Sequence, residues 1–131
     1  MNILQRVALA EVRVNLKEIL RYPLNFNDTP VDQKYTYKSL IRGNITSADI
    51  LLEIVCKKEP YRSEFLCLLE VLDIIQASAV ILLDICSANP PALRDLELLY
   101  KGRVFVDAII RDTADPTELR IYENKFVKVD R

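Results

Sequence analysis

The sequence predicts an α+β fold, in which N-terminal helices pack on a small mixed sheet that ends in a C-terminal β-meander. Three observations predict it. Apolar residues recur at helical spacing between Ile3 and Leu20, a run rich in β-branched residues extends over Ala79–Cys86, and apolar residues alternate over Val104–Ile110. The alternative is a mostly helical domain with a C-terminal β-hairpin.

The first predicted helix covers Ile3–Leu20 and is ended by Pro23. Its helical spacing is carried by Leu4, Ala8, Val12 and Leu16. A strand is the alternative, because every second residue from Val12 to Leu16 is also apolar. Further apolar residues make the helical face wider than one core contact requires, and these are Val7, Ala10 and Val14.

The next part of the chain contains a loop and two elements with open alternatives. Leu24–Gln33 is rich in Pro, Asn and Asp, which predicts a loop and the best candidate for a mobile segment. Lys34–Arg42 fits either a short strand or a helical turn. Ser47 is a candidate N-cap for a helix over Ala48–Lys58, where the density of apolar residues also fits a buried strand.

A central helix is predicted from Tyr61 to Ala77, with Pro60 at its first position. Its polar stripe is thin, which is typical of a helix buried on most sides, and its apolar face, like that of Ile3–Leu20, is wider than one core contact requires. The following segment, Ala79–Cys86, is interpreted as a buried strand, and the alternative is that the helix continues through it.

The C-terminal third is predicted to form one short helix and then β structure. The helix covers Ala92–Lys101 and ends at Gly102. Three strands follow, over Val104–Ile110, Leu119–Tyr122 and Phe126–Val129.

Length and composition indicate one globular domain over residues 1–131. Half of the residues are hydrophobic and 28% are charged, which is too apolar for a disordered chain and too charged for a bilayer. A small domain does not readily hide so much apolar surface. A homo-oligomer or a permanent protein partner is the physical remedy, because obligate interfaces resemble a protein core.

Several classes of function are disfavoured by the residues that the chain lacks. It has no histidine, the most common general base and metal ligand, and its two glycines are isolated, so no glycine-rich loop is present. The net charge of −1 offers no basic surplus for nucleic acid. Three cysteines without a CxxC pair do not form the usual zinc site and suit a reducing cytoplasm.

Three aspartates carry the enzymatic alternative. Suppose that Ala79–Cys86 and Val104–Ile110 are parallel strands. Asp84 then lies near the carboxyl end of the first strand, Asp107 in the middle of the second and Asp112 at its end. Active sites of open α/β sheets gather at the carboxyl ends of strands. Carboxylates there would hold Mg²⁺ for phosphoryl or phosphodiester chemistry. The same residues are also typical of a strand cap and of solvent-facing positions.

A basic aromatic patch is the second candidate site, and it consists of Lys34, Tyr35, Tyr37, Lys38 and Arg42. In a strand, alternation would place both tyrosines on one face, where they would stack on bases. A half-buried strand with a solvated lysine face explains the same residues. The acidic balance of the chain favours this second interpretation, so nucleic-acid contact is not expected.

We therefore predict a small cytoplasmic protein that acts by binding a protein partner or itself, as an adaptor, assembly or regulatory subunit. The N-terminus lacks the pattern of a signal peptide, and the most apolar stretch is interrupted by charges, so no membrane span is expected. No cofactor is expected, and the sequence favours a non-enzymatic role. The metal-dependent enzyme remains the alternative.

Overall fold

The computed structural model describes residues 1–21, 31–57, 63–86 and 90–127, and every regular element in these ranges is a helix. The helices are α1 (Ile3–Arg21), α2 (Val31–Cys56), α3 (Glu64–Cys86), α4 (Pro90–Thr113) and α5 (Pro116–Tyr122), followed by a short π-helical segment, η1 (Glu123–Val127). The predicted α+β class is therefore wrong, and so are the mixed sheet, the C-terminal β-meander and the alternative C-terminal hairpin. The described part of the protein is all-α.

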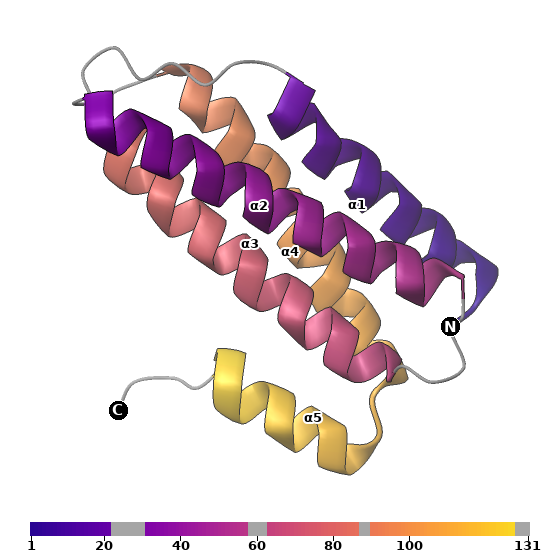
Figure 1. Ribbon diagram of the computed structural model, residues 1–131. Helices are drawn as coiled ribbons and strands as arrows, with labels where there is room; N and C mark the ends of the chain where they lie inside the picture. The colour runs from indigo at the N-terminus through magenta and orange to yellow at the C-terminus, as the bar shows by residue number, and fades with distance from the viewer. Residues whose placement is uncertain (22–30, 58–62, 87–89, 128–131) are drawn as a thin grey trace.

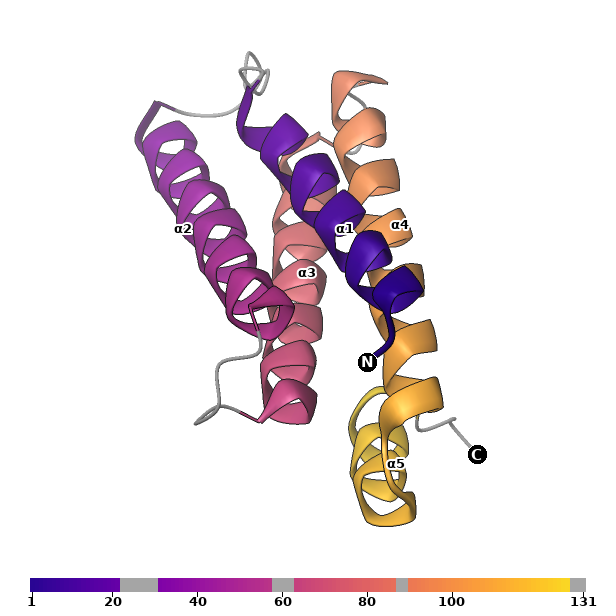
Figure 2. The same ribbon diagram turned by 90° about the vertical axis from the view of Figure 1, so that its right-hand side faces the viewer.

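The helices α1 to α4 form an antiparallel four-helix bundle (Figure 1). Each helix packs against the next one along the chain, and α4 closes the ring by packing against α1. Figure 2 shows α1 at the outside of the bundle, between α2 and α4. The short helix α5 follows α4 and lies beyond the end of the bundle at which α3 begins.

Capping bonds explain where two of the helices begin. At α1, the Gln5 backbone N–H donates to Asn2 Oδ1 (2.8 Å) and the Asn2 backbone N–H donates to Gln5 Oε1 (2.9 Å). Asp115 and Glu118 form the same reciprocal capping box before α5. These side chains satisfy N–H groups that have no carbonyl partner in the first turn of a helix.

The hydrophobic core lies between the four long helices. Each helix contributes buried residues at intervals of three and four, the spacing of one helical face. From α1 and α2 the buried residues are Leu9, Val12, Leu16, Ile19, Ile41, Ile45, Ala48, Leu52 and Val55. From α3 and α4 they include Phe65, Leu68, Val71, Leu72, Ile75, Leu82, Leu99, Val106, Ile109 and Ile110.

The segment interpreted as a buried strand, Ala79–Cys86, is the last part of α3. In the second half of α3, Ile75, Ser78 and Leu82 are buried, and their spacing of three and four residues is helical. Val80 is exposed. The Ser78 hydroxyl donates to the backbone oxygen of Ile74 at 2.8 Å, so the buried polar side chain is satisfied within the helix. Apolar residues on both faces of one helix produced the strand-like run.

The predicted strand Val104–Ile110 lies in α4, which continues through Gly102 instead of ending there. Val106 and Ile110 face the core while Val104 is half exposed. A Cβ on Gly102 would lie 3.4 Å from Val12 Cγ1 and 3.5 Å from Ile75 Cδ1. The glycine therefore lies where α4 packs on α1 and α3, with room for one methyl group, and it is not a helix terminator.

The remaining expectations have mixed outcomes. The predicted helix Ile3–Leu20 is confirmed as α1, while Lys34–Arg42 and most of Ala48–Lys58 belong to one continuous helix, α2. The predicted strand Leu119–Tyr122 is wrong, because it lies in α5, and residues 126–127 lie in η1. Residues 24–30 of the expected mobile loop and residues 128–129 lie outside the described residues, as does Lys58.

Helix α3 is long and apolar enough over Glu64–Leu83 to cross a membrane, judged by length and composition alone. The core helix of a water-soluble bundle has the same composition. Here α3 packs against both α2 and α4 and contributes many of the buried side chains. Of this stretch, 44% is buried inside the bundle.

Gly43 lies in the middle of α2, and a Cβ added there would have no heavy atom within 4 Å. We expect Gly43→Ala to raise the free energy of unfolding by about 0.5–1 kcal/mol, because glycine loses more backbone entropy than alanine in a helix. Urea unfolding measures this change. Gly102→Ala is the comparison inside α4, and its gain should be at least as large, because the new methyl group would also be in ordinary van der Waals contact with Val12 and Ile75. A destabilising Gly43→Ala would contradict a continuous α2.

Candidate interaction surface

The outer face of α1 carries the densest group of exposed apolar side chains among the described residues. Ile3 is 77% exposed, Leu4 79%, Val7 59% and Val14 60%. Ala10, between the two valines, is also exposed. We call Ile3, Val7, Ala10 and Val14 the α1 seam, because their spacing of four, three and four residues places them along one line of the helix.

The α1 seam lies on the side of α1 opposite to the core. Leu9, Val12 and Leu16 are fully buried against the bundle, at the same three- and four-residue spacing as the seam. Helix α1 is therefore apolar on two opposite faces, and its own bundle covers only one of them. A helix of a domain that acts alone usually presents polar residues on its outer face.

The other helices also expose large apolar side chains, and three of those on α4 fall on one line of the helix that Glu97 interrupts. The exposed side chains are Leu40 and Ile50 on α2, Leu66, Val80 and Leu83 on α3, Leu93, Tyr100 and Val104 on α4, and Ile121 on α5. Single exposed apolar residues are normal on protein surfaces, whereas a contiguous patch is typical of an interaction site. The contiguous patch on α1 is therefore the stronger candidate.

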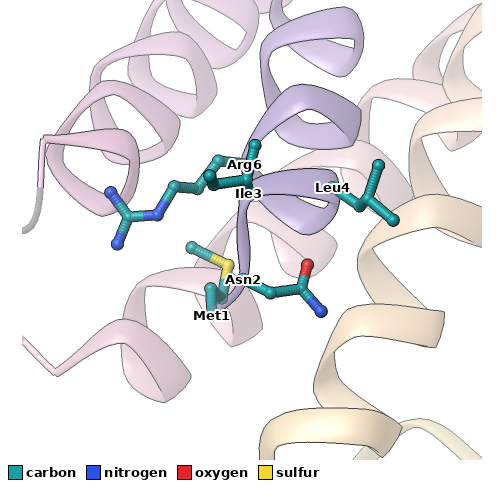
Figure 3. Close-up of a pocket in the computed structure, with 5 residues that line it drawn as sticks. All are labelled: Met1, Asn2, Ile3, Leu4 and Arg6. Carbon is teal, nitrogen blue, oxygen red and sulfur yellow. The ribbon is translucent and has the colours of Figure 1, made fainter.

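The first turn of α1 borders a shallow hollow of about 640 Å³, lined by Met1, Asn2, Ile3, Leu4 and Arg6. Figure 3 shows Leu4 directed toward α4 and Arg6 directed to the opposite side, toward α2. A second shallow groove of about 310 Å³ lies between α1 and α4, and Leu4, Ala8 and Phe105 contribute to its walls. Leu4 thus lines both depressions and extends the apolar surface from the α1 seam toward α4.

Ion pairs hold the α2 side of α1. Arg13 Nε lies 2.9 Å from Asp49 Oδ1, and Lys17 Nζ lies 3.6 Å from Asp49 Oδ2. The hydrogen bond to Asp49 raises the pKa of Arg13 further above its ordinary value. On α2, Lys57 Nζ lies 2.7 Å from Glu53 Oε1, and this contact lowers the pKa of Glu53. The basic edge of α1 is therefore matched to an acidic edge of α2.

Arg6 continues this basic edge at the first turns of α1. Its Nη1 donates to the backbone oxygen of Cys56 at 3.3 Å, at the end of α2. Its Nη2 is buried and has no hydrogen-bond acceptor in the described chain. Burial raises the pKa of the neighbouring Cys56 thiol, which is the opposite of what a reactive thiolate requires.

The α4 side of α1 is anchored at both ends. Near its start, Gln5 Nε2 donates to Asp112 Oδ2 at the end of α4. Near its end, Arg94 Nη2 donates to the backbone oxygen of Glu18 at 3.4 Å. Together with the Arg13–Asp49 pair on the other side, these bonds hold α1 in place. The α1 seam is therefore displayed on a fixed helix.

The three aspartates of the metal hypothesis do not share a strand end, because the strands are absent from the described chain. Asp84 is in the last turn of α3, whereas Asp107 and Asp112 are near the far end of α4, about 25 Å and about 33 Å along that helix. Asp107 accepts from Arg111 and from the Tyr122 hydroxyl, and Asp112 accepts from Gln5. The described residues contain no group of three His, Cys, Asp or Glu side chains that could hold a metal.

The basic aromatic patch lies in α2, where the alternation that would align its tyrosines does not apply. Positions 35 and 37 are two residues apart in a helix and do not share a face. Lys38 and Arg42 are exposed on α2. The side chains of Lys34, Tyr35 and Tyr37 lie outside the described part of the structure.

Comparisons with protein-family models, with curated proteins and with solved structures found no match to this chain. The bundle and its exposed helix α1 therefore carry the functional argument. The sequence indicated this surface through the extra apolar residues Val7, Ala10 and Val14. It did not indicate the Arg13–Asp49 pair, because those residues are far apart in the chain and meet only when α1 packs on α2.

Proposed function

We propose that this chain is a small cytoplasmic protein-interaction protein, an adaptor, assembly or regulatory subunit, and that the outer face of α1 is its docking surface. One observation carries the proposal, namely that α1 is apolar on two opposite faces while the bundle covers one. Exposed apolar residues in a contiguous patch favour association, because burying them releases about 25 cal/mol for each Å².

The surroundings of the α1 seam support the same proposal. Interfaces combine an apolar centre with a polar rim, and here Arg6 and Arg13 border one side of the seam while Glu11 and Glu18 border the other. The bonds from α1 to α2 and α4 hold the helix in place, which lowers the entropic cost of binding.

Site-specific photocrosslinking in the cells that naturally produce the chain tests this proposal. A photoreactive amino acid placed at Val7 should give one defined protein adduct, identified by mass spectrometry. Val14→Glu in the same chain should abolish the adduct, because it places a charge in the apolar surface that the partner covers. Glu70, exposed on α3 across the bundle, is the matched control position and should give no such adduct. Equal labelling at both positions, or none at Val7, would overturn the proposal.

A further inference from the structure

The α1 seam has the spacing of a helix that pairs with another helix. Apolar residues separated alternately by three and four positions form the a and d positions of a heptad pattern. In this assignment Val7 and Val14 occupy a positions, and Ile3 and Ala10 occupy d positions. All four residues are exposed.

The charges beside the α1 seam are sorted by sign. Arg6 and Arg13 occupy the g positions on the α2 side, as their bonds to Cys56 and Asp49 show. Glu11 and Glu18 occupy the e positions on the α4 side, in line with Leu4. One edge of the seam is therefore basic and the other is acidic.

This sorting identifies both the partner and its direction. In a parallel pair, each g residue faces the e residue five positions further along the other helix, so Arg6 faces Glu11 and Arg13 faces Glu18 of the second helix. An antiparallel pair brings the g edges together and places arginine against arginine, which is repulsive. The sequence of α1 is therefore complementary to a parallel copy of itself.

We propose that the occupant of the α1 seam is a second copy of this chain, with the two α1 helices parallel about a two-fold axis. This inference rests on the proposed function, because it names the partner of the same surface. A two-fold interface uses the same residues on both subunits, which requires a surface that is complementary to itself. The opposite charges on the two edges of α1 meet this requirement.

The charges in the bundle are compatible with the pairing. A guanidinium has five N–H donors, and the bonds of Arg13 to Asp49 use Nε and Nη2. Arg6 Nη2 has no hydrogen-bond acceptor in the described chain. Lys17 occupies the next seam position, where its Nζ lies 3.6 Å from Asp49, so the apolar part of the seam ends at Val14.

The seam is only two heptads long, so the dimer should be reversible. Small interfaces, below about 1,200 Å² in total, belong to weak complexes, and we expect a Kd of roughly 1–100 µM. Sedimentation equilibrium of the full chain from 1 to 500 µM should show monomers converting to dimers as the concentration rises. A chain that is monomeric at 500 µM would overturn the inference.

The position of the interface is tested by the same substitution at two valines of similar exposure. Val7→Glu should weaken the dimer by at least about 100-fold, because the new carboxylates face each other in an apolar seam. Val80→Glu makes the same substitution at an equally exposed position on α3 (62% against 59%) and should leave the Kd unchanged. Circular dichroism of both variants checks that each is folded. Dimerisation that resists Val7→Glu, or is lost equally in both variants, would contradict the assignment.

The relative direction of the two α1 helices is tested by introducing a cysteine at either of two exposed alanines. In a parallel pair the two copies of position 10 face each other, so the thiols introduced by Ala10→Cys should form an intermolecular disulfide under mild oxidation. Ala77→Cys, exposed on α3, has the same number of native cysteines and should give no additional crosslink. A dimer in which Ala10→Cys does not crosslink would exclude the parallel arrangement.

The outcomes also separate this inference from the proposed function. If the chain is monomeric but the Val7 photocrosslinker captures one other protein, and Val14→Glu abolishes that adduct, the proposed function stands and self-pairing is wrong. If neither a dimer nor a Val7 adduct forms, both are wrong. An adduct of twice the chain's mass together with a dimer sensitive to Val7→Glu supports both.

Discussion

Leu52→Ala should lower the free energy of unfolding by about 3 kcal/mol, because it removes a fully buried side chain and leaves a cavity between the helices. Leu52 belongs to the face of α2 that packs in the core with Ile45 and Ala48. Urea unfolding at low micromolar protein measures the change while keeping any self-association from contributing.

Ile50→Ala on the same helix is the matched control. Ile50 is 51% exposed, so its truncation should change the free energy of unfolding by less than about 0.5 kcal/mol. The two positions are adjacent on one face in a strand but on opposite sides of a helix. Equal losses at both positions would contradict the helical assignment of this segment.

The same region shows why the secondary structure was only partly predictable. Residues 50–55 are almost all apolar, so neither the helical nor the strand period stands out in the sequence. The structure resolves the pattern into a buried face with Leu52 and Val55 and an outer face with Ile50. Helix α1 is also apolar on two faces, but it was predictable because polar residues separate its apolar positions regularly. An almost unbroken apolar run, as in residues 50–55, removes that signal.

The C-terminal strands were predicted wrongly for a related reason. In α4, Val104 faces outward, whereas Val106 and Ile110 face the core. Read along the sequence, the apolar residues of these two helix faces together look like the alternation of a strand. Gly102 was interpreted as a helix terminator, although it lies inside α4, where a Cβ would be in ordinary van der Waals contact with Val12 and Ile75. Local propensity cannot show this, because these contacts arise only when α1, α3 and α4 are assembled.

The sequence predicted that the protein has an apolar interaction surface, but it did not predict which residues form that surface. The surplus of apolar residues in Ile3–Leu20 indicated a helix with more than one contact, and the exposed residues Val7 and Val14 lie on that helix. The metal hypothesis depended on two strands, and it lost its geometric basis when both became helices. The distance between Asp84 and Asp107 could not be inferred without the direction of α3 and α4.

Helix α5 is attached to the bundle by few contacts, of which Tyr122 provides the most buried side chain. Tyr122 is 3% exposed, its hydroxyl donates to Asp107 Oδ1, and the Arg111 guanidinium carbon lies 5.5 Å from its ring centroid. Burial, with the Asp107 carboxylate, raises the pKa of the Tyr122 hydroxyl, so the group remains a donor at neutral pH. Lys125 Nζ adds an exposed ion pair, 2.7 Å from Asp73 Oδ2.

Tyr122→Ala should therefore release α5 from the bundle without unfolding the bundle itself. Removing a buried aromatic side chain costs about 3 kcal/mol, but local opening of a peripheral helix limits the loss to the stability of that helix. Hydrogen exchange should show protection of Pro116–Val127 falling by roughly 100-fold, while α1 to α3 change little. Ile121→Ala, half exposed on the same helix, should leave the protection nearly unchanged. Equal loss of protection throughout the chain would show instead that α5 unfolds together with the core.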